Sequence, residues 1–426
     1  MVSPDDIAAH RQRAWEAQSA YVERASVFYR RLWNGQKPPA RLEDIAELPF
    51  SDKADLRAAQ PAMPPFGDYL AAAPERVSRL HRTSGTTGQA MNLAMSARDC
   101  EITEIVGARA QRLAGLGVGT TVVHCLNYQM WMGGLTDHLT LERTGATVVP
   151  FGVGSTELLI QTIQDTGITA ISCTPSYPAV LEAVIAEKFP GLAPRALGLK
   201  LGLFGGEPGI DDPAFRKRLS DTWGMQPRNA NYGVSDVFCN FASECAHDTA
   251  LHFVAQDVLH AELIDPDSGE CRVLAPGTQG ELVLTHLSRE CQPLVRFRTG
   301  DIIRIENTDR CACGCTGFRF RVIGRSDDMV VVRGLNMFPT MVAAVIQGFA
   351  ELTGDYRIVL DAPPPHDVLP VQVELAADAR DDGSLVRRIE ERFKQKLGAT
   401  MRATLLPYGS FPRTEGKTKR VIRSYQ

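Results

Sequence analysis

The chain carries the run Arg82-Thr83-Ser84-Gly85-Thr86-Thr87-Gly88-Gln89 at the start of an alternating series of strand and helix patterns. Such a loop of serine, threonine and glycine offers backbone N–H groups and hydroxyls to phosphate oxygens, and its glycines let the main chain approach closely. It is not a Walker A motif, because Gln89 stands where that motif requires a lysine. The missing lysine is expected near the other end of the chain, in Glu415-Gly416-Lys417-Thr418-Lys419-Arg420. This division predicts a phosphate loop whose catalytic charge comes from a different domain.

The composition is typical of a soluble globular protein, with 426 residues, 44% of them hydrophobic and 23% charged. This length exceeds the usual size of a single domain, so we expect two domains. Lysine and arginine (46) nearly balance aspartate and glutamate (50), and no long basic run is present, which argues against a nucleic-acid partner. We expect no membrane span and no secretory signal, and therefore a cytoplasmic location.

Residues 78 to 233 alternate apolar, β-rich runs with helical patterns. This alternation predicts a largely parallel sheet that is covered by helices on both faces. The expected strands are 120–126, 146–150, 168–174, 199–204 and 228–232. The expected helices are 98–114, 134–144, 156–166, 177–188 and 212–223, the first with Ser96 as its N-cap.

The pattern changes after Tyr232 to shorter strands separated by turn signals, which predicts an antiparallel region in the form of a distorted barrel. Beyond Gly324-Arg325-Ser326-Asp327-Asp328, a small α+β domain is expected. Its predicted elements are a strand at 329–333, a helix opened by Pro339, strands at 356–361 and 369–376, and a helix at 384–397. The predicted fold class is thus α/β, with a large N-terminal domain over residues 1–325 and a small mobile C-terminal domain over residues 326–426.

Six motifs follow one another in an order that is found in adenylate-forming enzymes. They are residues 82–89, Gly205-Gly206-Glu207-Pro208, Tyr232-Gly233-Val234-Ser235-Asp236, Arg298-Thr299-Gly300-Asp301, residues 324–328 and Glu415-Gly416-Lys417. The chain therefore resembles the superfamily of acyl-CoA synthetases, adenylation domains and luciferases over nearly its whole length. More narrowly, Val332-Arg333-Gly334-Leu335-Asn336-Met337-Phe338-Pro339 and the segment 27–31 resemble phenylacetate-CoA ligases. Each motif alone would be an ordinary hairpin, loop acid or solvated charge, so the interpretation depends on their joint order.

The resemblance implies a role for each matching residue of the ATP site. Tyr232 is expected to stack on adenine, and Asp301 is expected to bind both ribose hydroxyls through its two acceptor oxygens. Arg325 is expected to add a second ribose contact, while Lys417 bridges the attacking carboxylate and the α-phosphate. The other residues expected to bind ATP are Ser84, Gly85, Thr87, Gly88, Gly205, Gly206, Glu207, Pro208, Asn231 and Gly233.

Two residues depart from the family pattern. Gln89 replaces the lysine that is common at the end of the loop, which predicts a weaker hold on pyrophosphate. Asp236 replaces the usual glutamate that binds Mg²⁺; it keeps the hard oxygen ligand, so metal binding is expected with adjusted geometry. Lys417, Thr86 and Asp236 are the expected catalytic residues, which neutralise charge around the α-phosphorus.

The resemblance further implies a hinge at Asp327 that swings the C-terminal domain after adenylation. The swing would withdraw Lys417 and bring Arg333 and Gly334 to the channel through which a thiol reaches the adenylate. The expected thiol substrate is coenzyme A.

The segment from Asn127 to Gly134 is expected to line the acid pocket. Tyr128 and Trp131 could pack against a flat aryl ring, with Gly133 and Gly134 leaving room for it. The alternative is that Trp131 and Met132 are core residues at a helix start. Asn127 or Gln129 could hydrogen-bond a substituent, so a substituted benzoate or an anthranilate-like acid is as plausible as phenylacetate.

Three cysteines alternate in Cys311-Ala312-Cys313-Gly314-Cys315. The resemblance implies that Cys311 and Cys313 pair with Cys245 and His252 as four ligands of a structural Zn²⁺. Cys315 and His247 are the substitute ligands, and the alternative is a set of free thiols in a reducing compartment.

The sequence therefore predicts an ATP-dependent, AMP-forming acid–thiol ligase that activates an aromatic acid and transfers it to CoA, with Mg²⁺ and structural Zn²⁺. One alternative is an enzyme that loads an aryl or amino acid onto an acyl carrier protein. A second is a non-enzymatic nucleotide-binding module, against which the presence of Lys417, Asp301 and Arg325 argues. We expect a homodimer.

Overall fold

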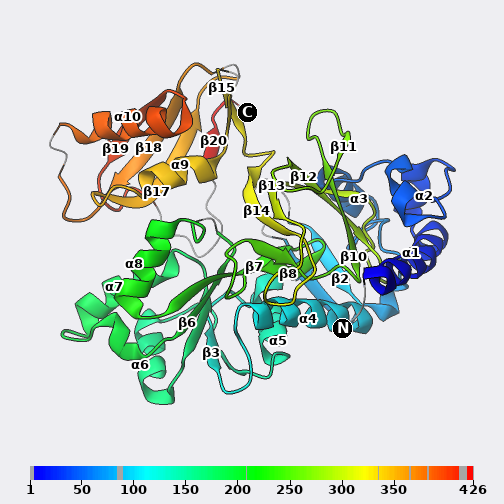
Figure 1. The fold of residues 1–426 in the computed structure, drawn as a ribbon, viewed down its shortest axis with the longest axis horizontal. Coiled ribbons are helices and arrows are strands. Elements are labelled where there is room, and N and C mark those ends of the chain that lie inside the picture. Colours follow the sequence, from blue (N-terminus) through cyan, green and yellow to red (C-terminus); the bar gives the residue numbers. More distant parts are fainter. Residues whose placement is uncertain are drawn as a thin grey trace. The chain divides into compact units, whose positions relative to one another are not determined.

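The computed structural model describes residues 4–83, 90–207, 209–333, 335–363, 366–380, 383–411 and 420–425. The chain divides into two compact units (Figure 1). The first comprises Met1–Gly206 and Leu219–Arg321, and the second comprises Glu207–Arg218 and Val322–Gln426. Within the described ranges, no helix combines the length and the apolar character that crossing a membrane requires.

Three helices precede the sheet of the first unit: α1 (Pro4–Ala25), α2 (Val27–Trp33) and α3 (Lys53–Ala62). None of them is among the elements predicted from the sequence. Helix α2 begins at Ser26, whose side chain accepts a hydrogen bond from the Tyr29 N–H group, and it buries Phe28, Tyr29 and Trp33. Helix α3 begins with a capping box between Asp52 and Asp55.

The predicted parallel sheet is present and is formed by β4 (Thr147–Pro150), β3 (Thr121–His124), β5 (Ala170–Cys173), β6 (Leu201–Gly205) and β7 (Gln226–Val234) in that spatial order. All four residues of β5 are buried, as expected for a central parallel strand. Four of the predicted helices occur as α4 (Ala97–Leu113), α6 (Thr156–Thr166), α7 (Tyr177–Lys188) and α8 (Pro213–Trp223). The predicted N-cap Ser96 is confirmed, because its side chain accepts a hydrogen bond from the Asp99 N–H group.

The predicted helix over 134–144 differs from the structure at its start. The chain first forms a wide π-turn, Met132–Thr136, and only then the α-helix α5 (Asp137–Glu142). Two glycines, Gly133 and Gly134, lie in this turn. Glycine disfavours regular helix, and π-turns are often found at functional sites, so this departure lies where the acid pocket was predicted.

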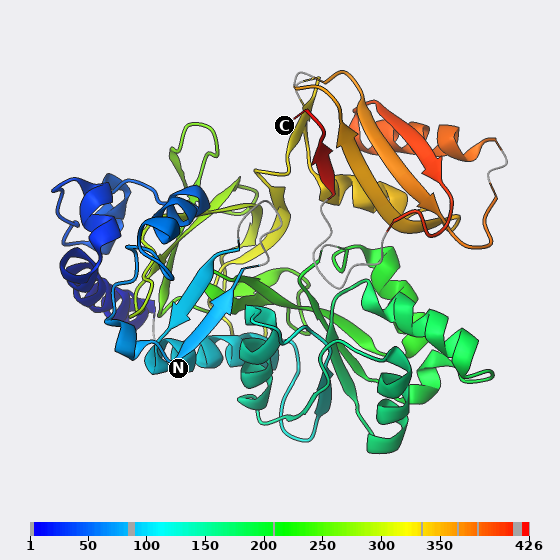
Figure 2. The same ribbon diagram turned by 180° about the vertical axis from the view of Figure 1, so that it is seen from behind.

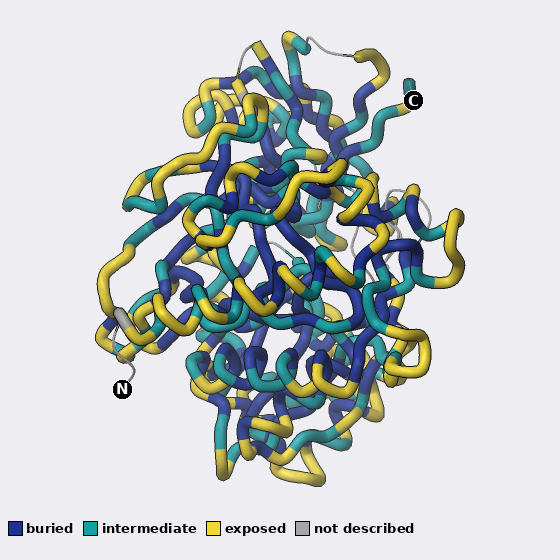
Figure 3. The backbone as a smooth tube through the Cα atoms, turned by 90° about the vertical axis from the view of Figure 1, so that its right-hand side faces the viewer, coloured by how far each residue is buried: buried dark blue, intermediate teal, exposed yellow. Residues whose placement is uncertain are grey.

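Strand β7 continues the parallel sheet into the predicted β-rich region. The antiparallel strands are β8 (Phe238–Ser243), β9 (Leu251–Phe253), β10 (Leu259–Ile264), β11 (Cys271–Arg272), β12 (Gln279–His286), β13 (Phe297–Asn307) and β14 (Arg319–Arg325). Together with the parallel strands they make one sheet in the order β11-β10-β12-β13-β14-β9-β8-β7-β6-β5-β3-β4. Figure 2 shows the ribbon from behind. Strands β5 and β8 are buried at every residue. Figure 3 shows how buried and exposed segments are distributed along the backbone. A separate hairpin of β1 (Arg79–Arg82) and β2 (Asn92–Met95) flanks the phosphate-loop motif.

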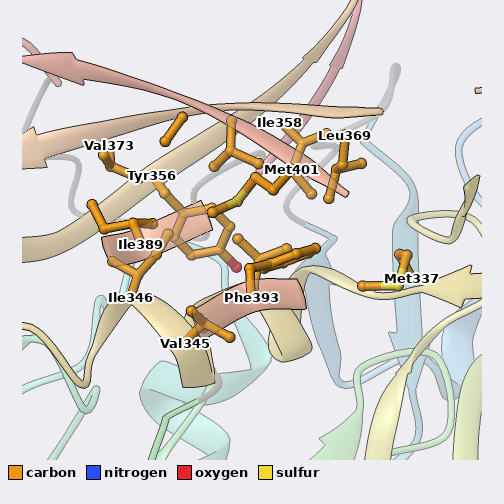
Figure 4. Close-up of a cluster of buried hydrophobic side chains, with 14 of the residues drawn as sticks. Met337, Val345, Ile346, Tyr356, Ile358, Leu369, Val373, Ile389, Phe393 and Met401 are labelled. Atoms are coloured by element: carbon orange, nitrogen blue, oxygen red, sulfur yellow. The ribbon is translucent and has the colours of Figure 1, made fainter. Parts of the chain in front are cut away.

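The second unit contains the predicted α+β domain. A hairpin of β15 (Val330–Val332) and β16 (Leu335–Met337) precedes α9 (Pro339–Ile346), and a four-stranded sheet has the order β19-β18-β17-β20. Its strands are β17 (Leu352–Leu360), β18 (Leu369–Leu375), β19 (Met401–Leu406) and β20 (Val421–Arg423). Helix α10 (Leu385–Leu397) packs beside α9 and β19. Phe393 and Tyr356 lie together in the buried cluster between helices and sheet (Figure 4). The sequence did not predict β16, β19 or β20.

Candidate active site

Two of the predicted nucleotide motifs, Gly205-Gly206 and Tyr232 to Asp236, lie at the carboxyl ends of the parallel strands β6 and β7, where α/β sheets usually bind ligands. The phosphate loop itself lies outside the described residues, but its base is described. The Thr83 N–H group donates to the Met91 carbonyl (2.9 Å), and the Met91 N–H group donates to Thr83 Oγ1 (3.0 Å). Paired hydrogen bonds thus close the hairpin at the point where the loop begins and ends.

Tyr232 and Asp301 form one polar contact from two distant strands. The Tyr232 hydroxyl on β7 donates to Asp301 Oδ2 on β13 at 2.8 Å. The Tyr232 ring also makes edge contacts with Phe241 and Phe320, at centroid distances of 5.3 and 5.2 Å. These contacts fix the orientation of the ring, while Asp301 is largely buried. The Tyr232 ring and the Asp301 carboxylate, which are predicted to contact adenine and ribose, are therefore held beside each other.

Two glycines of the predicted ATP site are required by close backbone packing. A Cβ atom on Gly205 would lie 2.4 Å from the Asn231 carbonyl oxygen, and one on Gly233 would lie 2.0 Å from the Cys239 carbonyl oxygen. Both distances are far inside van der Waals contact. Any other residue would push the strands that carry Asn231 and Tyr232 apart.

Asp236, the predicted Mg²⁺ ligand, is ion-paired with a lysine that the sequence interpretation missed. Lys53 Nζ, in the first turn of α3, lies 3.1 Å from Asp236 Oδ2. The Asp236 side chain is 2% exposed, and within the described part of the chain its Oδ1 atom has no hydrogen-bond partner. One carboxylate oxygen is thus free to accept a metal ion, which fits the preference of Mg²⁺ for one or two carboxylates beside phosphates.

Buried histidines hold the predicted acid-pocket loop in place. His124 Nε2 lies 3.0 and 3.1 Å from the Gly133 and Gly134 carbonyl oxygens, and Nδ1 lies 3.1 Å from Ser172 Oγ. A carbonyl only accepts, so Nε2 carries the proton and Ser172 donates to Nδ1. Burial lowers the pKa of His124 to about 4, so the ring is neutral near pH 7.

The predicted pocket residues lie together on this loop. The Tyr128 hydroxyl lies 2.8 Å from His138 Nδ1, and Tyr128 and Trp131 are both half-buried. A Cβ atom on Gly134 would lie 2.3 Å from the Asn127 carbonyl oxygen, so only glycine fits there. Trp131 keeps part of its surface accessible while the next residue, Met132, is 2% exposed. Met132 is thus a core residue, as the alternative interpretation expected, whereas Trp131 is not.

Cys245, His252, Cys311 and Cys313 meet in one cluster. One ligand atom from each lies within 4.8 Å of the others, and the Cys245 and Cys311 sulfur atoms are 3.8 Å apart. Two Zn–S bonds of about 2.3 Å at a tetrahedral angle give roughly the same sulfur separation. His252 Nδ1 lies 3.0 Å from the Ala250 carbonyl oxygen, and its buried Nε2 atom has no nitrogen or oxygen partner among the residues that the structure describes. These donors fit a tetrahedral metal ion.

Phe411 and Arg420, which flank the segment 412–419 that contains Lys417, both belong to the second unit. The Phe411 N–H group donates to Glu374 Oε1 (3.0 Å). After the segment, Arg420 Nη2 lies 3.1 Å from Asp355 Oδ1, and its guanidinium covers the Tyr356 ring at 4.8 Å. Both ends of this segment are therefore tied to the C-terminal sheet.

The predicted hinge and channel residues lie near the first hairpin of this unit. Arg325 is ion-paired with Asp327, with Nε and Oδ1 2.9 Å apart. Arg333 is exposed, at the turn of the β15–β16 hairpin, with a left-handed φ of 49°. Its N–H group donates to the His366 carbonyl at 2.9 Å, which fixes the turn.

Comparison with known proteins decides the family. The chain is 36% identical to phenylacetate-coenzyme A ligase of Thermus thermophilus over 95% of this chain and 93% of the relative. It is 35% identical to phenylacetate-coenzyme A ligase of Pseudomonas putida over 88% of this chain and 84% of that relative. The chain belongs to the phenylacetate-CoA ligase family.

Two further comparisons agree with this family. Residues 334–424 match the model of the AMP-binding enzyme C-terminal domain. A crystal structure of 2-hydroxyisobutyryl-CoA ligase in the postadenylation state has a TM-score of 0.87 at 28% identity, covering 99% of this chain and 89% of that one. The predicted α/β fold and the predicted AMP-forming acid–CoA ligase are thus confirmed.

Several predicted site residues of this phenylacetate-CoA ligase family member lie outside the described residues, so their placement stays a prediction. They are Ser84, Gly85, Thr86, Thr87, Gly88, Pro208, Gly334 and Lys417. Lys53 was missed because no local motif marks it and its partner lies 183 residues away. Its position in a capped helix start was the only sequence signal.

Proposed function

We propose that this phenylacetate-CoA ligase family member activates an aromatic carboxylic acid as its acyl-adenylate and transfers the acyl group to CoA. The observation that carries this proposal is the contact between Tyr232 and Asp301 at the carboxyl end of the sheet, in a chain that matches acid–CoA ligases over nearly its full length. Phenylacetate is the acid named for the relatives, and benzoate-type and anthranilate-type acids are the other candidates.

In the first half-reaction, a carboxylate oxygen of the acid attacks the α-phosphorus of ATP, and pyrophosphate leaves. Negative charge gathers around one phosphorus atom and must be neutralised. We propose that Lys53 and Lys417 supply cationic charge, with Lys53 compensating for Gln89 in the loop. Asp236 would hold Mg²⁺ through its free Oδ1 atom, and the ion would add charge neutralisation at the phosphates.

In the second half-reaction, the CoA thiolate attacks the acyl carbon, the thioester forms and AMP leaves. A lysine between nucleotide and carboxylate would obstruct the thiol, so we propose that the C-terminal domain moves about Asp327 and withdraws Lys417. The ties of Phe411 and Arg420 to the C-terminal sheet support this proposal, because they make the lysine segment travel with that domain. Arg333 and Gly334 would then line the thiol channel.

We also propose that Cys245, His252, Cys311 and Cys313 bind a structural Zn²⁺ ion. The support is the convergence of four donors and the unpartnered, buried His252 Nε2. Cys315 is left as a free thiol in this proposal. The homodimer and the cytoplasmic location stay predictions.

A pyrophosphate-release screen over aryl acids, with and without CoA, tests the activity. We expect release with at least one aryl acid and thioester formation when CoA is added. Failure with every acid would favour the non-enzymatic nucleotide-binding module. Release followed by transfer to a carrier protein but not to CoA would favour the carrier-loading alternative, which the CoA-ligase relatives disfavour.

The Lys417→Ala variant tests the division between the two half-reactions. It should abolish adenylate formation but largely spare thioester formation from a supplied acyl-adenylate. Equal loss of both steps would contradict the proposed withdrawal of the lysine.

A further inference from the structure

Asp137 is a buried carboxylate that no proposed step of the reaction uses. It is the first residue of α5, directly after the π-turn, and it is 2% exposed. Its Oδ2 atom accepts a hydrogen bond from the Asn231 side chain, and the Cys239 thiol lies beside the carboxylate, whereas no described residue forms a hydrogen bond with its Oδ1 atom. Burial raises the pKa of Asp137 to about 7, against the opposing effects of the Asn231 and Cys239 side chains. An acceptor atom buried without a partner is costly, so a bound donor would stabilise the site.

The carboxylate lies directly beside the predicted acid pocket. A Cβ atom on Gly133 would stand 3.6 Å from Asp137 Oδ2 and 3.7 Å from Leu126 Cδ1. Gly133 is half-buried and has no side chain, so nothing from that residue covers the carboxylate. Asn231, the other neighbour, is a half-buried residue of the nucleotide-binding strand. Asp137 thus touches both the turn predicted to line the acid pocket and the strand that carries Tyr232.

We infer that Asp137 is a specificity-determining residue, which accepts a hydrogen bond from an amino or hydroxyl substituent of the aryl acid. This inference rests on the proposed aryl-CoA ligase function and narrows its substrate to acids that carry such a donor. A site built to bind a donor discriminates strongly against the analogue that lacks it, because the buried acceptor is then left unpaired. Asn127 and Gln129, considered from the sequence, are not needed for this recognition.

The test compares matched acids with purified full-length protein. Benzoate is compared with its amino and hydroxy derivatives at each ring position, and phenylacetate with its corresponding derivatives, by kcat/KM for pyrophosphate release. We expect at least one donor-bearing acid to exceed its unsubstituted parent by about ten- to a hundredfold. Equal or lower values for every donor-bearing acid would overturn the inference while leaving the ligase function intact. Release with no acid would refute the proposed function, and this inference with it.

The Asp137→Asn variant gives a second readout. The amide keeps the shape of the side chain, but its single oxygen is expected to accept the bond from Asn231, which turns an NH₂ group toward the pocket. The preference for donor-bearing acids should therefore fall to about that of the unsubstituted acids. A merely structural role would lower kcat/KM for all acids by one common factor, which would contradict the inference. Asp165→Asn, at an exposed position of α6, is the matched control and should keep the wild-type preference. If Asp137→Asn does not fold, the wild-type comparison still decides.

Discussion

The metal cluster offers a stability test with a magnitude that follows from the structure. Cys245 follows β8, whereas Cys311 lies in the loop between β13 and β14, 66 residues further along the chain. A bound ion would join these segments in the folded state and close a long loop. In the chain-entropy model, a crosslink over a loop of this length stabilises the fold by about 4 kcal/mol.

Replacing Cys311 by serine should remove most of that contribution. We expect Cys311→Ser to lose bound zinc and to unfold about 4 to 6 °C below the wild type. The assay is thermal unfolding followed by circular dichroism, together with elemental analysis of protein purified without chelator. A strong chelator should lower the melting temperature of the wild type to that of the variant.

Cys315→Ser is the matched control, because this cysteine lies in the same loop but outside the cluster. It should keep one zinc per chain and the wild-type melting temperature. Wild-type protein without stoichiometric zinc would refute the metal site. Equal effects of the two substitutions would refute the choice of ligands.

Three further predictions concern charge. Lys53→Met should lower kcat/KM for adenylation about ten- to a hundredfold, the usual cost of losing a charged hydrogen-bond donor, in a pyrophosphate-release assay. Arg420→Gln should reduce adenylation more than thioester formation from a supplied adenylate, because it loosens the end of the Lys417 segment. Burial lowers the pKa of His81 and His124 to about 4, so the unfolded chain binds protons first as the pH falls below about 6.5. Stability should therefore fall between pH 6.5 and 4, by about 3 kcal/mol for each histidine, in denaturant titrations. Asp137 offsets part of this loss, because its pKa is raised to about 7 and the folded state binds its proton more tightly than the unfolded chain.

Each of these predictions has a contrary outcome. Lys188→Met, at an exposed ion pair of α7, should leave adenylation unchanged, and the same result for Lys53→Met would remove its proposed role. Parallel loss of both half-reactions in Arg420→Gln would mean that its anchoring serves stability alone. Constant stability from pH 6.5 to 4 would show that the buried histidines do not control acid unfolding.

Local sequence determined much of this fold. The helices at 156–166 and 177–188 have the predicted bounds, because their periodicity and end signals lie within the segments themselves. The strands that form the parallel sheet were placed to within a few residues for the same reason. The π-turn at Met132–Thr136 was not predicted, because its shape depends on close packing of Gly134 against the Asn127 backbone.

The sequence by itself determined the family and the order of the nucleotide motifs, because each motif is short and its residue types carry their own chemistry. Only the tertiary structure showed that Lys53 pairs with Asp236, that one buried Asp137 oxygen has no hydrogen-bond partner among the described residues, and that His252 meets three cysteines. These facts depend on which distant strands and helices pack together. For example, β9 pairs with β14 and so brings His252 opposite Arg319, near the cysteine loop. Whether a side chain is buried, and which side chain it contacts, depends on the packing of elements that are distant in the sequence. No local sequence pattern encodes that packing.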